Sequence, residues 1–244
     1  MLKIQNLKRY FGGVKAVDRA SFEIKDNTIT ALIGPNGSGK TTVFNLISGI
    51  ISEDEGKIIF DGLDITHKSI EATSNLGISR LFQQSRLFRN LTVRDNLILA
   101  LDNEDTKFWK NLFFHKITKE EEEKIKQISE LCNITAFMNK PAKELSFGQK
   151  RLAEIARAIL KPHKFLMLDE PVAGITPPLR KEIAELLLKL KSNGETILLI
   201  EHDMTFTLGV SDLVVVMDSG KVIAEGTPKE IKTNPKVLEA YLGD

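Results

Sequence analysis

The feature that most constrains the fold is an apolar strand followed at once by a glycine-rich loop. Residues 28–34, TITALIG, are almost unbroken apolar and β-branched, which is typical of a strand covered on both faces of a parallel sheet. The next residues, GPNGSGKTT at 34–42, match the spacing G-x-x-x-x-G-K-[ST], and an apolar helical pattern starts at Val43. A strand, a loop of this kind and a helix in succession predict a phosphate-binding loop in an α/β protein.

The residue types in this loop suit phosphate chemically. Gly34, Gly37 and Gly39 let the backbone turn its amides toward phosphate oxygens. Lys40 adds a positive charge near the β and γ phosphates, and the Thr41 hydroxyl can coordinate Mg²⁺. The alternative, a flexible turn with an accidental lysine, leaves the flanking strand and helix unexplained. The predicted nucleotide-binding residues are therefore Gly34, Pro35, Asn36, Gly37, Ser38, Gly39, Lys40, Thr41 and Thr42.

The rest of the chain predicts an α/β core with two additions. Two runs resemble the first strand, KFLMLDE at 164–170 and ETILLIEHD at 195–203, with helical stretches between them. Short β-type runs from Lys3 to Asp64 predict an antiparallel sheet near the N-terminus. The pattern is helical from about 87 to 160, and 218–226 indicates a turn between two strands.

Polar side chains stand at the ends of the two later strands. Asp169 and Glu170 follow the apolar residues 165–168, and ligands bind at this edge of α/β sheets. One carboxylate can serve Mg²⁺ while the other orients a water for attack on the γ phosphate, although acidic residues at strand ends are common. His202 follows the third strand in the same way. A GTPase would carry N-K-x-D, and NKPA at 139–142 lacks the aspartate that reads guanine.

A second loop, ELSFGQKR at 144–151, opens an amphipathic helix. Ser146 and Gln149 have the S-x-x-Q spacing of a capping box, which explains both residues structurally. A helix N-terminus with free amides and a glycine is also an anion site, and the two interpretations use different amides. The local pattern alone leaves both open.

Composition narrows the class of protein. The chain has 244 residues, 42% of them apolar, and 34 basic against 33 acidic residues, so no overall field favours nucleic acid or an acidic membrane surface. No apolar run approaches the ~20 residues that span a bilayer. The single cysteine, Cys132, forms no intrachain disulfide, and no leader precedes the run at 2–7, so we expect a cytoplasmic protein.

The motifs together resemble the ATP-binding subunits of ABC transporters, and the match covers essentially the whole chain. They occur in the order found in that family: GPNGSGKT at 34–41, FQQ at 82–84, LSFGQ at 145–149, FLMLDEP at 165–171 and IEHD at 200–203. The resemblance implies a RecA-like P-loop NTPase core with an N-terminal antiparallel β-subdomain, formed by residues 1–86 and 161–244. It also implies an inserted α-helical subdomain, residues 87–160, that carries the signature motif.

The resemblance assigns roles to single residues. It implies that Gln83 is the Q-loop residue and a metal-associated group, and that Asp169 is the Walker B carboxylate associated with Mg²⁺. Glu170 would be the general base and His202 the switch histidine near the γ phosphate. Phe11 resembles the aromatic residue that stacks on adenine.

In this family the signature loop binds the γ phosphate of a nucleotide held by another subunit. The resemblance therefore implies that Ser146, Phe147, Gly148 and Gln149 complete a site in a second ATP-binding subunit, so that two chains close head to tail around two ATP molecules. The partner would be the same chain or a different ATPase subunit. For adenine stacking, Tyr10 is the alternative to Phe11.

Departures from the usual family pattern narrow the substrate. Phe147 replaces the first glycine of L-S-G-G-Q, and together with FGGV at 11–14, RLF at 86–88 and AYLG at 240–243 it resembles the branched-chain amino acid import branch. Thr176 stands where the D-loop usually has Asp or Asn, so communication across the dimer can differ. The resemblance implies permease subunits in the membrane, an indirect solute-binding protein and a position on the cytoplasmic face.

Other functions remain open from the sequence. ATPase subunits that export lipid or lipopolysaccharide have similar length and tails. ABC ATPases that act on DNA carry a long coiled coil between phosphate loop and signature, and those of translation carry two ATPase units; this chain has neither, so no nucleic-acid partner is expected. We also expect the surface formed by residues 83–114, which are rich in aromatic side chains, to dock a membrane partner. The alternative is that Phe108, Trp109, Leu112 and Phe113, which have helical spacing, pack in the core.

Overall fold

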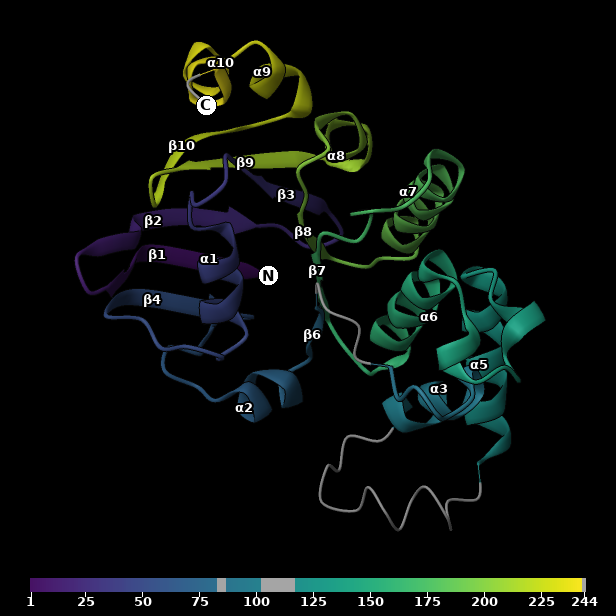
Figure 1. The fold of residues 1–244 in the computed structure, drawn as a ribbon. Helices are drawn as coiled ribbons and strands as arrows, with labels where there is room; N and C mark the ends of the chain where they lie inside the picture. Colours follow the sequence, from purple (N-terminus) through teal and green to yellow (C-terminus); the bar gives the residue numbers. More distant parts are fainter. Residues whose placement is uncertain (83–86, 102–116, 243–244) are drawn as a thin grey trace.

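The computed structural model describes residues 1–82, 87–101 and 117–242, and two sheets organise this part of the chain (Figure 1). The smaller sheet is antiparallel, as predicted for the N-terminal region. Its strand order is β2-β1-β4-β5. The strands are β1 (Leu2–Phe11), β2 (Val14–Ile24), β4 (Glu55–Phe60) and β5 (Leu63–Asp64).

The larger sheet has the order β10-β9-β3-β8-β7-β6 and is parallel except where β9 pairs with β10. Its strands are β3 (Ile29–Ile33), β6 (Ile78–Leu81), β7 (Phe165–Asp169), β8 (Ile197–Ile200), β9 (Leu213–Asp218) and β10 (Lys221–Gly226). Every residue of β3, β7 and β8 is buried, which confirms the three predicted strands of a parallel sheet. The turn predicted at 218–226 joins β9 to β10.

Side chains of β7 show why this strand is apolar up to Asp169. Phe165 and Met167 enter one hydrophobic core, with α1 and the antiparallel sheet. Leu166 and Leu168 point to the opposite face and enter a second core, shared with the helical region. The helices around the larger sheet are α1 (Lys40–Ile47), α2 (Ile70–Asn75), α7 (Pro177–Ser192), α8 (Met204–Val210), α9 (Pro228–Lys232) and α10 (Pro235–Leu242).

The segment between β6 and β7 is helical where it is described. It forms a lobe to one side of the sheets, at the lower right of Figure 1. Its helices are α3 (Val93–Leu101), α5 (Lys119–Leu131) and α6 (Phe147–Leu160), with short 3-10 turns at Thr135–Phe137 and Ala142–Glu144. Capping boxes at Thr118 and Ser146 start α5 and α6, and the box at Ser146 confirms the predicted one.

The helix after the phosphate loop begins earlier than its apolar pattern. The pattern indicates a start at Val43, but α1 begins at Lys40. Gly39, with φ of 102°, is the N-cap, so the turn that ends the loop leads directly into the helix. No helix in the described ranges combines the length and the apolar character needed to span a bilayer.

Candidate nucleotide site

Two glycines of the phosphate loop are required by their surroundings. Gly34 has φ of 149° and Gly39 has φ of 102°. A Cβ at Gly34 would lie 2.0 Å from the Met217 carbonyl oxygen, and one at Gly39 would lie 2.2 Å from the Ala16 carbonyl oxygen. Both neighbours are backbone and cannot move aside, so side chains are excluded at both positions. The loop is thus seated tightly on β9 and β2.

Lys40 folds its ammonium group back over this loop. Its Nζ donates to the carbonyl oxygens of Gly34 and Pro35 at 2.8 Å each, and to Ser38 Oγ at 3.2 Å. Burial lowers the pKa of Lys40, and the negative charges of Glu170 and Asp169 oppose that shift. The predicted phosphate-binding lysine therefore lies near the two acidic residues from the end of β7.

The remaining loop residues differ in how far they are exposed to solvent. Ser38 is buried, whereas Asn36 and Gly37 are exposed and Pro35 is half-buried. Thr41 is exposed and Thr42 half-buried in the first turn of α1, where backbone amides have no partner within the helix. The loop, the helix N-terminus and a positive side chain together form a surface suited to phosphate oxygens.

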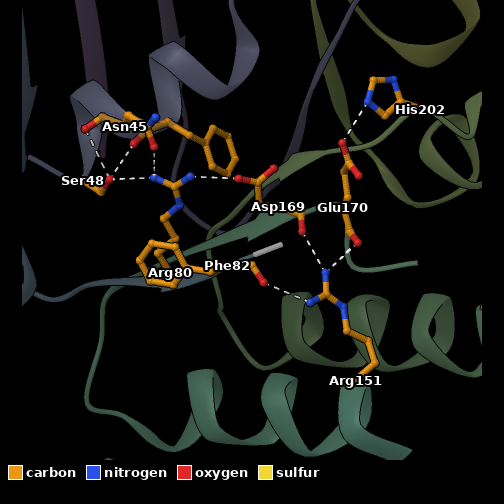
Figure 2. A network of polar contacts seen from close by, with 9 residues as sticks. Asn45, Ser48, Arg80, Phe82, Arg151, Asp169, Glu170 and His202 are labelled. Carbon is orange, nitrogen blue, oxygen red and sulfur yellow. Dashed lines mark hydrogen bonds and ion pairs between the residues drawn. The ribbon is translucent and has the colours of Figure 1, made fainter. Parts of the chain in front are cut away.

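The two predicted carboxylates have different partners (Figure 2). Asp169 is buried, and its Oδ2 accepts a hydrogen bond of 2.8 Å from Arg80 Nη2. Glu170 lies beside it in a left-handed backbone conformation, with φ of 48°. Its Oε1 is 3.0 Å from Nε2 of His202. The structure therefore brings three predicted site residues together and gives each acid its own cationic or titratable neighbour.

A buried acid that the sequence analysis did not single out joins these loops. Glu201 Oε1 accepts from the Val172 amide at 2.8 Å, and Oε2 accepts from the His202 amide at 3.1 Å. Burial raises the pKa of Glu201, and these backbone hydrogen bonds oppose the shift. Glu201 thus ties the segment after Glu170 to the segment that carries His202.

Arg80, on β6, was also missed. In addition to Asp169, its Nη1 donates to Asn45 Oδ1 at 2.8 Å and to Ser48 Oγ at 2.9 Å, both on the segment that follows the phosphate loop (Figure 2). The sequence signal is that GISRLF places a charged residue between apolar residues of a short β-type run. A charge buried at such a position needs partners, so it could have been flagged.

Arg151 of α6 is the second buried arginine that was missed. It sits one turn before Ile155 on the apolar face of the helix, which is the signal that could have found it. Its guanidinium donates to backbone carbonyl oxygens just after β6 and at the end of β7 (Figure 2). The acceptors are Phe82 O at 3.1 Å, Asp169 O at 2.8 Å, Glu170 O at 2.6 Å and Pro171 O at 3.0 Å, with Glu154 Oε2 at 3.2 Å.

The signature segment has the predicted cap and an exposed aromatic residue. Ser146 Oγ accepts from the Gln149 amide at 3.2 Å, and Gln149 Oε1 accepts from the Ser146 amide at 3.0 Å. Phe147 is 63% exposed. A Cβ on Gly174 would lie 3.4 Å from its ring, so the aromatic side chain lies along the loop after β7. Gly148 is where α6 meets α7, since a Cβ there would lie 2.4 Å from Leu179.

The two candidate aromatic residues for adenine stacking differ in environment. Phe11 ends β1 and is 45% exposed, with the Arg9 guanidinium carbon 4.7 Å from its ring centroid. The hydroxyl of Tyr10 donates to Asp18 Oδ1 at 2.9 Å, which raises the pKa of Tyr10. Phe11 is therefore the more available surface for stacking.

Three further predictions concern Gln83, the aromatic segment 107–114 and Thr176. Gln83 and the aromatic segment 107–114 lie outside the described residues, so their predicted roles stay predictions. Thr176 is the N-cap of α7, without a hydrogen bond from its side chain to the helix.

The donors at the site fit Mg²⁺. Asp169 supplies a carboxylate and Thr41 a hydroxyl near the same loop, and both are hard oxygen donors. The described residues include no group of three or more His, Cys, Asp or Glu that could hold a metal by themselves. Mg²⁺ is usually bound by one or two protein groups together with phosphate and water, and Asp169 and Thr41 are two such groups.

A cavity of about 260 Å³ lies behind the site, between the sheet and the helical lobe. Its lining includes Arg80, Phe82 and Ser48, together with Glu154 and Arg157 of α6. The cavity therefore reaches the same arginine that binds Asp169.

Known protein families match the part of the chain that forms this site. Residues 17–173, which contain the phosphate loop, the signature and β7, match the family described as “ABC transporter”. The chain belongs to the ATP-binding cassette family of transporter ATPases. Residues 221–244 of this cassette also match the family “Branched-chain amino acid ATP-binding cassette transporter”.

Relatives of the cassette match along its whole length. The “Probable branched-chain amino acid transport ATP-binding protein LivG” of Archaeoglobus fulgidus is 40% identical, covering 100% of this chain and 95% of the relative. The “High-affinity branched-chain amino acid transport ATP-binding protein BraF” of Pseudomonas aeruginosa is 38% identical, covering 100% and 98%. A solved cassette of an ABC transporter in its ADP conformation has a TM-score of 0.89 and 36% identity, covering 100% and 99%.

Proposed function

We propose that this chain is the ATP-hydrolysing subunit of a transporter that imports branched-chain amino acids through partner permeases in the membrane. The observation that carries the proposal is similarity over the full chain, at 40% and 38% identity, to two proteins named for that transport. The separate match of the C-terminal residues 221–244 to a branched-chain amino acid family supports the same substrate.

The proposed chemistry uses the two acids differently. Asp169 and the Thr41 hydroxyl would hold Mg²⁺, which neutralises charge on the β and γ phosphates when it is bound. Glu170 accepts a proton from the attacking water, and the contact of 3.0 Å with His202 orients that carboxylate. Lys40 and the amides at the start of α1 bind the phosphate oxygens, and Phe11 supports the adenine.

We propose further that two ATP-binding subunits share each nucleotide. The exposed Phe147 and the capped N-terminus of α6 support this, because they offer amides and a glycine to an anion that arrives from outside the chain. The helical segment 87–160 would act as a subdomain on the core of 1–86 and 161–244. Permeases would hold the complex at the cytoplasmic face of the membrane.

The shared site is tested by mixing two inactive variants. Lys40→Ala damages the phosphate loop and Ser146→Arg damages the signature, so each homodimer has two defective sites. In a mixed dimer one site combines the intact Lys40 of one chain with the intact Ser146 of the other. Some ATP hydrolysis should return on mixing at high protein concentration, or when the substitutions are split between natural partner subunits. No recovery in either format would reject the shared site.

The transport function is tested by uptake in the native cells. Deletion of the gene should abolish uptake of labelled leucine, isoleucine and valine, and the wild-type gene should restore it. Glu170→Gln should fail to restore uptake while the purified variant still binds ATP, because only the group that handles water has changed. Normal uptake of all three amino acids in the deletion strain would overturn the proposal, and a defect in envelope lipid would indicate export instead.

A further inference from the structure

We propose that Arg80 is a positioning residue for Asp169, holding the metal-site carboxylate in a fixed orientation relative to the phosphate-loop helix. This inference rests on the proposed Mg²⁺-ATP site. It concerns a residue on β6, a strand that contributes none of the predicted nucleotide-binding or catalytic residues.

The contacts of Arg80 divide between the two elements that must be aligned. Nη2 donates to Asp169 Oδ2 at 2.8 Å, at the end of β7. Nη1 donates to Asn45 Oδ1 at 2.8 Å and to Ser48 Oγ at 2.9 Å, on α1 and at its C-cap. One rigid fork thus joins the helix that carries Thr41 to the strand that carries Asp169.

Two aromatic rings hold the fork in place. The guanidinium carbon of Arg80 lies 5.4 Å from the ring centroid of Phe44 and 4.9 Å from that of Phe82. The side chains of Arg80 and Asp169 are each only 6% exposed. Packing and hydrogen bonds therefore restrict both partners of the ion pair, and its geometry is better defined than that of a surface pair.

A buried ion pair is weak evidence of a stabilising role, because well-packed apolar residues often replace such pairs without loss. Positioning explains the arrangement better. Arg80 engages one oxygen of the Asp169 carboxylate and so fixes how the other can be presented to a metal. Mg²⁺ demands nearly ideal octahedral geometry at short distances, so the orientation of a ligand matters. Glu170, the second acid, has its own contact of 3.0 Å with His202.

The test uses the full chain in a Glu170→Gln background, which prevents turnover, with Mn²⁺ as a spectroscopic probe for the metal. Arg80→Gln should weaken Mn²⁺ binding to the ATP complex by on the order of tenfold or more, the usual effect of losing a partner of a metal ligand. ATP affinity measured in EDTA should change by less than about twofold, because the phosphate loop is intact. In a chain with Glu170 unchanged, Arg80→Gln should lower the kcat of ATP hydrolysis by the same factor as it lowers Mn²⁺ affinity.

Two further variants separate positioning from general stability. Asn45→Ala removes one Nη1 partner but keeps the pair with Asp169, so its Mn²⁺ affinity should stay within about threefold of the parent. Arg80→Lys keeps the positive charge but lacks the forked guanidinium, so its Mn²⁺ affinity should lie between those of the parent and of Arg80→Gln. If Arg80→Gln does not fold, the Mn²⁺ affinities of Arg80→Lys and Asn45→Ala are compared instead. A positioning role then requires a larger loss in Arg80→Lys than in Asn45→Ala.

The outcomes are distinct. Mn²⁺ affinity unchanged in Arg80→Gln, or equal losses of Mn²⁺ affinity in Asn45→Ala and the Arg80 variants, would overturn the positioning role. So would equal losses of ATP affinity with and without metal. Failure of the parent chain itself to bind ATP and Mn²⁺ would instead refute the proposed function on which the inference rests.

Discussion

Replacing Arg151 by methionine should destabilise the whole fold, because this side chain joins the helical lobe to the sheet. Methionine keeps most of the apolar stem but supplies no donor. Four backbone carbonyl oxygens, on residues 82, 169, 170 and 171, would lose a hydrogen bond. The Glu154 carboxylate would lose its cationic partner while remaining buried.

The magnitude follows mainly from Glu154. Its side chain is 8% exposed, and its other oxygen, Oε1, has no hydrogen-bond partner among the described residues. Breaking such a buried pair costs about 3–5 kcal/mol, and each lost hydrogen bond to a carbonyl adds about 0.5–1.5 kcal/mol where water cannot replace it. We expect a loss of about 5 kcal/mol, which for a chain of this length lowers Tm by roughly 10–20 °C.

Urea unfolding of the purified chain, followed by circular dichroism, measures this loss. Arg94→Met is the matched control, since the Arg94–Glu122 pair is exposed and worth at most about 1 kcal/mol. The double variant Arg151→Met, Glu154→Gln should regain about 2 kcal/mol over Arg151→Met, because it removes the uncompensated charge. If Arg151→Met unfolds within about 1 kcal/mol of wild type, the reasoning from these contacts is wrong.

Three further outcomes follow from single contacts. Burial raises the pKa of Cys132 to about 12, so its thiol should resist maleimide at pH 8 in the folded chain and react once urea unfolds it. Burial lowers the pKa of His163, but the hydrogen bond and charge of Glu195 outweigh that effect and raise it above its usual 6.5. The protonated ring of His163 therefore stabilises the fold fully below about pH 6, and this contribution is lost as the pH rises through the folded-state pKa. The urea midpoint of the wild-type chain should decrease between about pH 6 and 8 for this reason. Glu195→Gln should make that decrease smaller. Phe11→Ala should weaken ATP binding by about 2- to 10-fold while Tyr10→Phe leaves it unchanged, as measured with a fluorescent nucleotide analogue; the reverse order would assign the stacking to Tyr10.

Strands with continuous apolar sequence could be predicted, and those with a broken pattern could not. β3, β7 and β8 are runs of buried residues, so local composition identifies them. β6 carries Ser79 and Arg80 within four residues, which hides its place beside β7. The sequence of β9 is apolar, but its pairing with β3 depends on the assembled sheet and cannot be read from the local sequence.

The site shows the same division. The phosphate loop and the acids at the end of β7 have fixed spacings, so the chemistry they suit follows from the sequence. The partners of Arg80 and Arg151 lie far away in the sequence. Most acceptors of Arg151 are backbone carbonyl oxygens, and since every residue type has one, the sequence does not indicate which of them bind the arginine. Glu201 could not be predicted, since an acid at a strand end has the same sequence pattern whether it is exposed or buried.

The position of β3 has a consequence for how the chain is made. Both of its neighbours in the sheet, β8 and β9, come from the last fifth of the sequence, and β8 begins 164 residues after β3 ends (197 − 33). At about 5–20 residues per second, a ribosome needs roughly 8–33 s to make that interval. Throughout this time the strand ITALI has been synthesised but has neither of its sheet partners. Nascent chains that stall before Ile197 therefore present an unpaired apolar strand, which makes them substrates for chaperones and prone to aggregate.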